Sequence, residues 1–168
     1  YAGSYTMPPR KAFLLEESSH DAFALLPSWN ENVIGVKSFT YFPHNEDPYK
    51  SLYSKILLFD RKHGEPLALV DGTSVTFFRT AGVSALASQF LSREDSETLL
   101  LLGTGNLARF LIRAHASVRP LKKIFLWGRT KANAEAVVAD MQKELPDIEF
   151  VVADDIQTAC GQADIVVA

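Results

Sequence analysis

A glycine-rich stretch in the second half of the chain constrains the fold more than any other feature. The apolar run at residues 99–102 leads directly into residues 103–108, which read GTGNLA and fit the pattern G-x-G-x-x-A. In this pattern the first glycine permits a tight turn, the second lets the backbone approach a pyrophosphate, and the last small residue lets a helix pack closely on the strand. The stretch therefore predicts a phosphate-binding turn between a strand and a helix.

The sequence on both sides of this turn predicts repeated β-α units. Apolar residues recur at helical spacing after the turn, and residues 124–126 predict a second strand. A helix that begins after Thr130, strands at 148–152 and 163–167, and a short helix at 155–160 continue the pattern. A Rossmann domain normally has six strands, so we expect the chain to end inside such a domain. The alternative is an α/β turn that holds no ligand.

The end of the second predicted strand bears on the choice of cofactor. NAD-selective turns usually carry a carboxylate there, whereas NADP versions place an arginine near the 2′-phosphate. This chain reads Trp-Gly-Arg-Thr at residues 127–130, with no acidic residue. The Arg129 guanidinium suits a phosphate and the Thr130 hydroxyl stands at a helix start, although Arg129 as a solvated surface charge is the alternative. We predict NADP(H) as the preferred cofactor, with NAD(H) as the alternative.

Composition excludes several classes of function. A net charge of −3 and a pI near 5.8 argue against a nucleic-acid-binding protein. The single cysteine, Cys160, cannot form an internal disulfide, and we expect a buried thiol. The four histidines show no metal-ligand spacing, so no metal site is predicted. The apolar runs are too short to cross a membrane and no signal peptide opens the chain, so we predict a cytoplasmic enzyme.

The first half of the chain predicts several strands, two of which form a hairpin. Strands are expected at residues 11–15, as an edge strand, and at 33–42, 53–60 and 67–70. The last two form a hairpin in which Gly64 supplies a positive φ. A turn at residues 71–72 precedes a short helix that Thr73 or Ser74 would cap.

Three cationic side chains in this half are candidate anion ligands. Arg10 follows two prolines that stiffen the backbone, and Arg79 stands just before a predicted helix. Lys37 shares one face of its strand with Phe39 and Tyr41, an environment that would lower its pKa and make its proton useful. The alternatives are surface charges for the two arginines and, for Lys37, an edge-strand lysine that blocks aggregation.

A helix is predicted at residues 80–91, at the end of the first half. Its apolar stripe consists of Val83, Leu86, Ala87, Phe90 and Leu91. Its other face is small, with Ala81, Ser84, Ala85 and Ser88, and would allow close approach by another helix or a cofactor. The charged residues at 92–96 predict a domain boundary, which divides the chain into residues 1–95 and 96–168.

Several motifs, in this order and spacing, resemble those of the ornithine cyclodeaminase/mu-crystallin family. They are Met-Pro-Pro-Arg at 7–10, Gly-Val-Lys at 35–37, GEPLALVDG at 64–72, Arg-Thr-Ala at 79–81 followed by Ser84 and Ala85, GTGNLA at 103–108 and WGRT at 127–130. The resemblance implies an N-terminal α/β domain that binds substrate and forms a homodimer, followed by a Rossmann domain that binds NAD(P).

The resemblance also implies roles for individual residues. Arg10, Lys37 and Arg79 would hold the carboxylate of a small amino or imino acid, and Lys37 would also act at the reacting carbon and nitrogen as the catalytic group. Arg79 would also contact the cofactor. The remaining cofactor ligands would be Ser51, Thr80, Gly103, Thr104, Gly105, Asn106, Leu107, Ala108, Gly128, Arg129 and Thr130. The family's catalytic aspartate would lie beyond Ala168.

Members of the family differ in activity. Cyclodeamination of ornithine uses a retained NAD, for which a carboxylate is expected after the second strand, whereas Arg129 suits a reductase that draws on NADPH. The cyclodeaminase-like members commonly have glutamine where Leu107 stands and histidine near Leu52, which also argues against ornithine. We therefore predict NADPH-dependent reduction of a cyclic imino acid, Δ1-pyrroline-2-carboxylate or Δ1-piperideine-2-carboxylate, to proline or pipecolate. The alternatives are ornithine cyclodeaminase, alanine dehydrogenase and a non-enzymatic NADPH-dependent binding protein like mu-crystallin.

Overall fold

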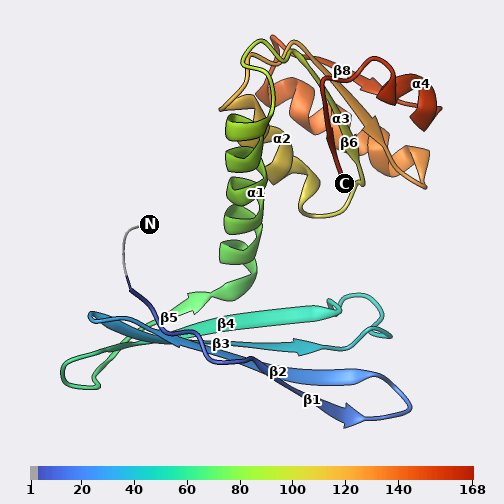
Figure 1. The fold of residues 1–168 in the computed structure, drawn as a ribbon. Helices are drawn as coiled ribbons and strands as arrows, with labels where there is room; N and C mark the ends of the chain where they lie inside the picture. Colours follow the sequence, from blue (N-terminus) through green and yellow to red (C-terminus); the bar gives the residue numbers. More distant parts are fainter. Residues whose placement is uncertain (1–3) are drawn as a thin grey trace. The chain divides into compact units, whose positions relative to one another are not determined.

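The computed structural model describes residues 4–168 and divides the chain into two compact units (Figure 1). The division falls between Thr76 and Phe77, inside the long helix α1 (Gly72–Leu91), whereas the sequence placed a boundary at residues 92–96. The first unit is an antiparallel sheet and the second a parallel sheet with helices, so the predicted α/β class is confirmed.

The first unit is a five-stranded sheet whose strands follow chain order from β1 to β5 (Figure 1). The four predicted strands are present, with β1 at the edge, and Gly64 has φ 74° in the hairpin turn. The sequence missed β2, which contains Pro27. β1 stops pairing with β2 at Leu25, so the missing N–H of Pro27 costs no hydrogen bond to β1. The strands are β1 (Lys11–Glu16), β2 (Asp21–Trp29), β3 (Val33–Tyr41), β4 (Leu52–Asp60) and β5 (Pro66–Asp71).

Helix α1 begins earlier than predicted and runs without a break for 20 residues. The cap is Asp71, not Thr73 or Ser74, because its carboxylate accepts the Ser74 amide at 2.7 Å. This bond and the ammonium of Lys55 lower the pKa of Asp71 to about 2. Gly72 lets the first turn approach the sheet, since a Cβ there would lie 2.3 Å from Ser54 Oγ.

The second unit contains the predicted β-α units in a parallel sheet ordered β8-β7-β6-β9. This is the order 3-2-1-4 of the first part of a Rossmann fold. The strands are β6 (Thr98–Leu102), β7 (Lys123–Trp127), β8 (Glu149–Val152) and β9 (Ile165–Val167). The helices are α2 (Ala108–Ala116), α3 (Lys131–Glu144) and α4 (Ile156–Cys160).

Alternate residues of the central strand β6 pack into two hydrophobic clusters. Leu99 and Leu101 lie in the larger cluster with residues of α2 and α3, whereas Leu100 packs with Phe125 and with Ala159 of α4. Because Leu99, Leu100 and Leu101 are all at most 1% exposed, β6 is the centre of this unit. A strand buried on both faces explains the continuous leucine run that precedes the turn.

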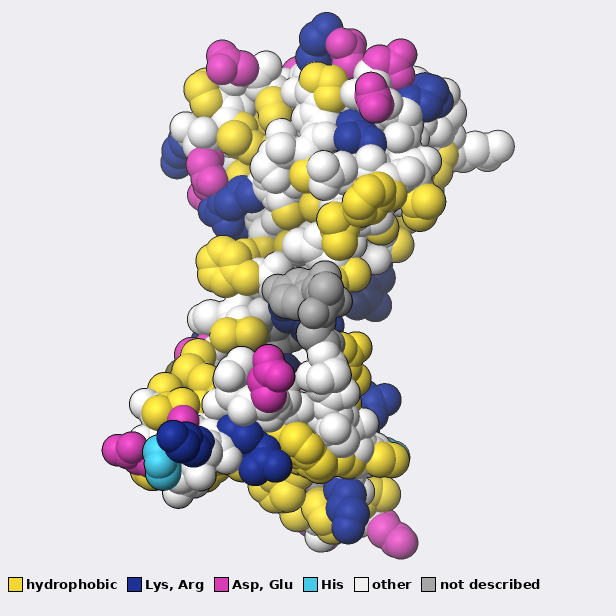
Figure 2. Space-filling view, turned by 60° about the vertical axis from the view of Figure 1, so that its left-hand side comes forward, with side chains coloured by type: hydrophobic (Ala, Val, Ile, Leu, Met, Phe, Trp, Pro, Cys, Tyr) yellow, Lys and Arg dark blue, Asp and Glu magenta, His cyan; other side chains and the backbone are white. Residues whose placement is uncertain are grey.

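The small face of α1 allows close approach by another helix, as expected from its residues. The small residues Ala81, Ala85 and Ser88 are buried, so this face provides the close packing. The apolar stripe is exposed instead, with Phe90 at 77% and Leu91 at 85%. Figure 2 shows hydrophobic side chains at the surface of both units. Small residues were buried here because they let two helices approach closely.

Three further expectations concern Cys160, metal sites and membrane-spanning helices. Cys160 is exposed at the end of α4, so the prediction of a buried thiol was wrong. Within residues 4–168, no group of three or more histidine, cysteine, aspartate or glutamate side chains is arranged to hold a metal ion. In the same residues, no helix has both the length and the apolar character needed to cross a membrane.

Candidate functional site

The glycine-rich turn joins β6 to α2 and leaves backbone amides available for an anion. Gly103 has φ +124°, which favours glycine, and Ala108 is 3% exposed in the larger hydrophobic cluster. Nothing lies within 4 Å of where a Cβ of Gly105 would be, so the space beside this residue is open. In the described part of the chain, the amides of Gly105, Asn106 and Leu107 donate to no other backbone group. Such amides at a helix start suit a phosphate.

The end of β7 is attached directly to this turn. The Gly103 amide donates to the Trp127 carbonyl at 2.8 Å. Gly128 lies against Thr104, and a Cβ at Gly128 would be 2.6 Å from Thr104 Cγ2. Glycine at 128 is therefore required for the contact that brings residues 128–130 beside the glycine-rich turn.

A cationic group stands at the start of α3. Thr130 is the N-cap residue, but its side chain makes no capping hydrogen bond, and the first turn of α3 contains no acidic residue. Arg129 is exposed, and among residues 4–168 no hydrogen bond or ion pair engages its guanidinium. Lys131, which follows Thr130, donates to Asp154 at 2.7 Å. The sequence analysis did not find this pair, because the two residues are 23 positions apart and belong to different loops.

Thr80 has an unpaired polar atom. Its Oγ1 is buried and has no hydrogen-bond partner among the described residues. Nearby on α1, the rings of Phe77 and Phe78 lie 5.2 and 5.0 Å from the ring of Phe110 on α2. This end of the second unit's part of α1 therefore packs on the helix that follows the glycine-rich turn. A buried hydroxyl without a partner is costly and suggests an additional ligand.

Lys37 lies in the central strand of the first sheet, which excludes the edge-strand interpretation. Its ammonium donates to the hydroxyl of Thr76, which in turn donates to the Gly72 carbonyl at 2.7 Å. Thr76 therefore orients Lys37. The sequence analysis missed Thr76, because it did not extend α1 back to this residue.

The remaining predicted ligands lie at different places. Lys11 pairs with Leu25, and Leu26, the next residue of β2, pairs with Lys37. Arg10 therefore enters the sheet beside the row that contains Lys37. Ser51 is exposed just before β4, and its carbonyl accepts the Phe42 amide. Arg79 is exposed on α1 in the second unit.

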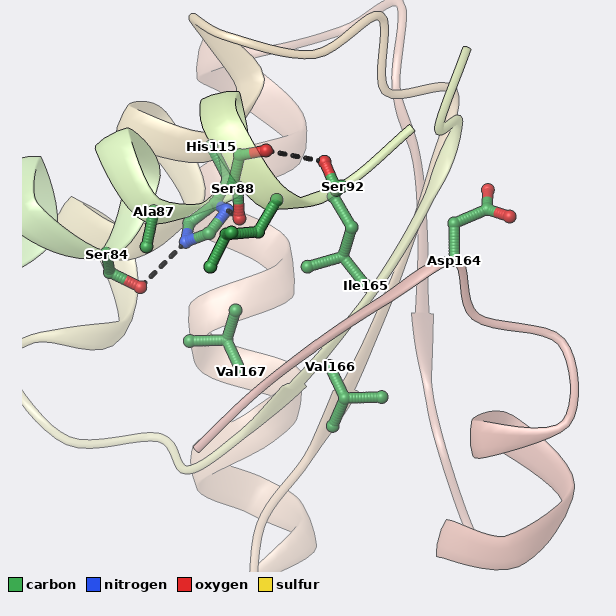
Figure 3. A pocket seen from close by; sticks show the side chains of 10 residues that line it. Ser84, Ala87, Ser88, Ser92, His115, Asp164, Ile165, Val166 and Val167 are labelled. Atoms are coloured by element: carbon green, nitrogen blue, oxygen red, sulfur yellow. Dashed lines mark hydrogen bonds between the residues drawn. The ribbon is translucent and has the colours of Figure 1, made fainter. Parts of the chain in front are cut away.

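A separate cavity of about 310 Å³ lies between α1, α2 and β9 (Figure 3). His115 is fully buried, and its two ring nitrogens are hydrogen-bonded to serine hydroxyls. Nε2 lies 3.0 Å from Ser84 Oγ and Nδ1 lies 3.1 Å from Ser88 Oγ. Arg119, also buried, donates to the Ser88, Gln89 and Ser92 carbonyls at the end of α1. The bonds with His115 explain why the small face of α1 contains serines, because their hydroxyls attach the helix to α2.

Comparison with known proteins agrees with this geometry. The sequence profile of the ornithine cyclodeaminase/mu-crystallin family matches residues 1–168. The chain belongs to this family. A member from Colwellia psychrerythraea, a Δ1-pyrroline-2-carboxylate reductase, is 50% identical over 99% of the chain and 54% of its own length. The chain thus spans about half the length of the curated relatives it matches.

Solved structures of family members have the same fold. The Δ1-pyrroline-2-carboxylate reductase of Thermococcus litoralis, in complex with NADH and L-proline, is 30% identical with a TM-score of 0.86. The match covers 96% of this chain and 50% of that protein. A lysine cyclodeaminase is 26% identical with a TM-score of 0.79, over 95% of this chain and 46% of that one.

Proposed function

We propose that the protein reduces a cyclic imino acid with a nicotinamide dinucleotide. The substrate is Δ1-pyrroline-2-carboxylate or its six-membered homologue, and the product is proline or pipecolate. The 50% identity to the Colwellia psychrerythraea reductase carries this proposal. The Thermococcus litoralis relative, solved with NADH and L-proline, supports the same class of cofactor and product.

The residues of the second unit fit a dinucleotide. The open space at Gly105 and the unpaired amides at the start of α2 suit the pyrophosphate. The buried Thr80 hydroxyl lacks a partner that a polar cofactor group would supply. The proposed contacts with the dinucleotide also include Thr104, Asn106 and Leu107. Gly128 contributes through its close contact with Thr104.

The chain's own residues bind the substrate and supply charge. The bound dinucleotide supplies hydride for the imine carbon. Arg10, Lys37 and Arg79 hold the substrate carboxylate, since cations that form charge-assisted hydrogen bonds can fix a small anion in one orientation. Lys37, oriented by Thr76, keeps the imine nitrogen protonated, because a positively charged imine accepts hydride more readily.

We assign the 2′-phosphate of NADPH to Arg129 and Thr130. The guanidinium has no partner within residues 4–168, the Thr130 hydroxyl makes no capping bond, and no carboxylate follows β7 to bind ribose hydroxyls. NADH, which the Thermococcus litoralis relative binds, lacks this phosphate. The proposed preference for NADPH therefore depends on residues 128–130 of this chain.

The test is to titrate the protein with NADPH and NADH and to assay imine reduction. We expect Arg129→Ala to weaken NADPH binding about ten- to a hundred-fold, because a hydrogen bond to a charged group is lost, and to leave NADH binding unchanged. Lys143→Ala, which removes one positive charge at the other end of α3, is the control. If the protein binds NADH more tightly than NADPH and Arg129→Ala changes neither affinity, the assignment is overturned.

The same assays separate the alternatives. An ornithine cyclodeaminase, the class nearest to the lysine cyclodeaminase structure, would release ammonia from ornithine without added reductant. Alanine dehydrogenase would oxidise NADH with pyruvate and ammonia. A binding protein would hold NADPH and consume none in the presence of either imine.

A homodimer remains a proposal. Hydrophobic residues are exposed along the first sheet, including Phe13, Leu14, Leu15, Leu67 and Leu69, and such surfaces commonly mark interfaces. Measurement of the molar mass in solution tests it, and a monomer would contradict it.

A further inference from the structure

We propose that Asp154 is a specificity-determining residue that limits the preference for NADPH by neutralising Lys131. This inference rests on the proposed 2′-phosphate site at Arg129 and Thr130. With Lys131 free, the loop would present two cations to the phosphate, whereas in the structure one of them is paired. The preference for NADPH over NADH is then smaller than it would be with both cations free.

The location of the pair follows from the parallel sheet. β7 and β8 are neighbours, with Leu126 paired to Val152, and the Ala153 amide donates to the Leu126 carbonyl at 2.9 Å. The loops after both strands therefore lie at the same edge of the sheet. Lys131 follows Arg129 and Thr130 directly, and its Nζ lies 2.7 Å from Asp154 Oδ1.

The neighbouring carboxylate cannot replace Asp154. Asp155 caps α4, where its side chain accepts the Thr158 amide at 2.7 Å, and the bonds to Thr158 lower the pKa of Asp155. Asp154 makes no such capping bond within residues 4–168 and pairs with Lys131 across the edge. Both side chains of the pair are exposed, at 61% and 79%, so the pair can exchange partners.

Charge explains why this matters for one cofactor only. The 2′-phosphate is doubly or nearly doubly negative at neutral pH, so it attracts Lys131 and is repelled by Asp154. The hydrogen bond to Asp154 raises the pKa of Lys131, so the lysine is charged. Its charge is already paired with the Asp154 carboxylate. The adenosine ribose of NADH carries no such charge, and its binding does not depend on the pair.

The test compares Asp154→Asn with a matched control. The half-buried Lys123 and the exposed Glu149 form a pair, 3.1 Å apart, at the opposite ends of the same two strands. Glu149→Gln therefore removes one exposed carboxylate far from the proposed site. The dissociation constants of NADPH and NADH are measured for both variants by fluorescence titration. We expect Asp154→Asn to tighten NADPH binding about three- to ten-fold, with NADH and the control variant unchanged.

A second background tests the role of Lys131. Lys131→Ala should weaken NADPH binding, and Asp154→Asn should gain little when added to it. Equal changes for both cofactors, no gain for NADPH, or a full gain without Lys131 would each overturn the inference. An NADPH affinity unaffected by Arg129→Ala would instead refute the 2′-phosphate site itself, and an absence of imine reduction would refute the reaction but not the effect on binding.

Discussion

The two units bury their hydrophobic residues very differently. In the first unit, Ala24 is the only hydrophobic residue of the described range 4–76 that is buried, and the strands of its sheet are mostly half-buried or exposed. The second unit has two clusters of buried residues around β6. The parallel sheet is therefore stabilised by its own helices, whereas the antiparallel sheet gains little from burial within the chain. The glycine-rich turn, for which we propose cofactor binding, lies on this well-packed second unit.

The largest expected effect tests this difference directly. Leu99→Ala, at a residue that is fully buried in β6, should lower the free energy of unfolding of the second unit by about 3–5 kcal/mol, since it removes buried methyl groups and leaves a cavity. Leu57→Ala, at a half-buried residue of β4, should cost about 1–2 kcal/mol.

The two tryptophans allow each unit to be followed separately during denaturation. Trp29 is in β2 and Trp127 in β7, so Trp127→Phe leaves a reporter in the first unit and Trp29→Phe one in the second. A cost for Leu57→Ala equal to that for Leu99→Ala would contradict the comparison. It would show that the first sheet is covered by another surface in solution.

A smaller effect tests whether the first unit has any tightly packed point. Gly72→Ala would place a Cβ 3.0 Å from the Ser54 carbonyl carbon and closer still to its Oγ, so it should cost about 1–3 kcal/mol. Gly82→Ala on the same helix is the control, because nothing lies within 4 Å of its Cβ and alanine favours helix by up to about 1 kcal/mol. Thermal unfolding of both variants measures this. A neutral Gly72→Ala would mean that α1 does not rest on the sheet at Ser54.

The smallest effect concerns pH and the second unit. Burial lowers the pKa of His115 below its usual 6.5, so the unfolded chain binds more protons than the folded one as the pH falls through about 6.5. Stability should therefore decrease below that pH, by at most about 1.4 kcal/mol per pH unit for one proton, and level off below the folded pKa. The groups that face this region are the serines on α1, Arg119 in the segment after α2, and Asp164, which lines the same cavity.

His115→Gln removes the titrating group and should flatten this part of the stability profile, measured by urea denaturation from pH 7.5 to 5. His63→Gln, in the exposed hairpin turn of the first unit, should leave the profile of the second unit unchanged. An unchanged slope in His115→Gln would show that another group is responsible.

Much of the second unit could be predicted because its signals are local. A leucine run buried on both faces, a glycine with positive φ at 103 and small residues at 105 and 108 follow one another within ten positions. Each has a direct structural requirement at its own position. The first unit was harder: Pro27 concealed β2, because a proline is tolerated only where a neighbouring strand stops pairing, and the sequence does not show where β1 stops.

The candidate site divides in the same way. The types and spacing of Lys37, Arg129 and Thr130 could be selected from the sequence, but their partners could not. Thr76 meets Lys37 from 39 positions away, and Asp154 meets Lys131 from 23 positions away. Such pairs depend on sheet register and on where a helix begins, which no local pattern specifies.

The sequence by itself determined the strand-turn-helix of residues 98–108, the order of the β-α units and the absence of an acidic residue after β7, because backbone conformation and strand burial act on neighbouring residues. Only the tertiary structure decided that His115 bonds to the serines of α1, that Thr76 orients Lys37 and that Asp154 pairs with Lys131. These contacts join segments far apart in the chain, and close packing between elements selects them.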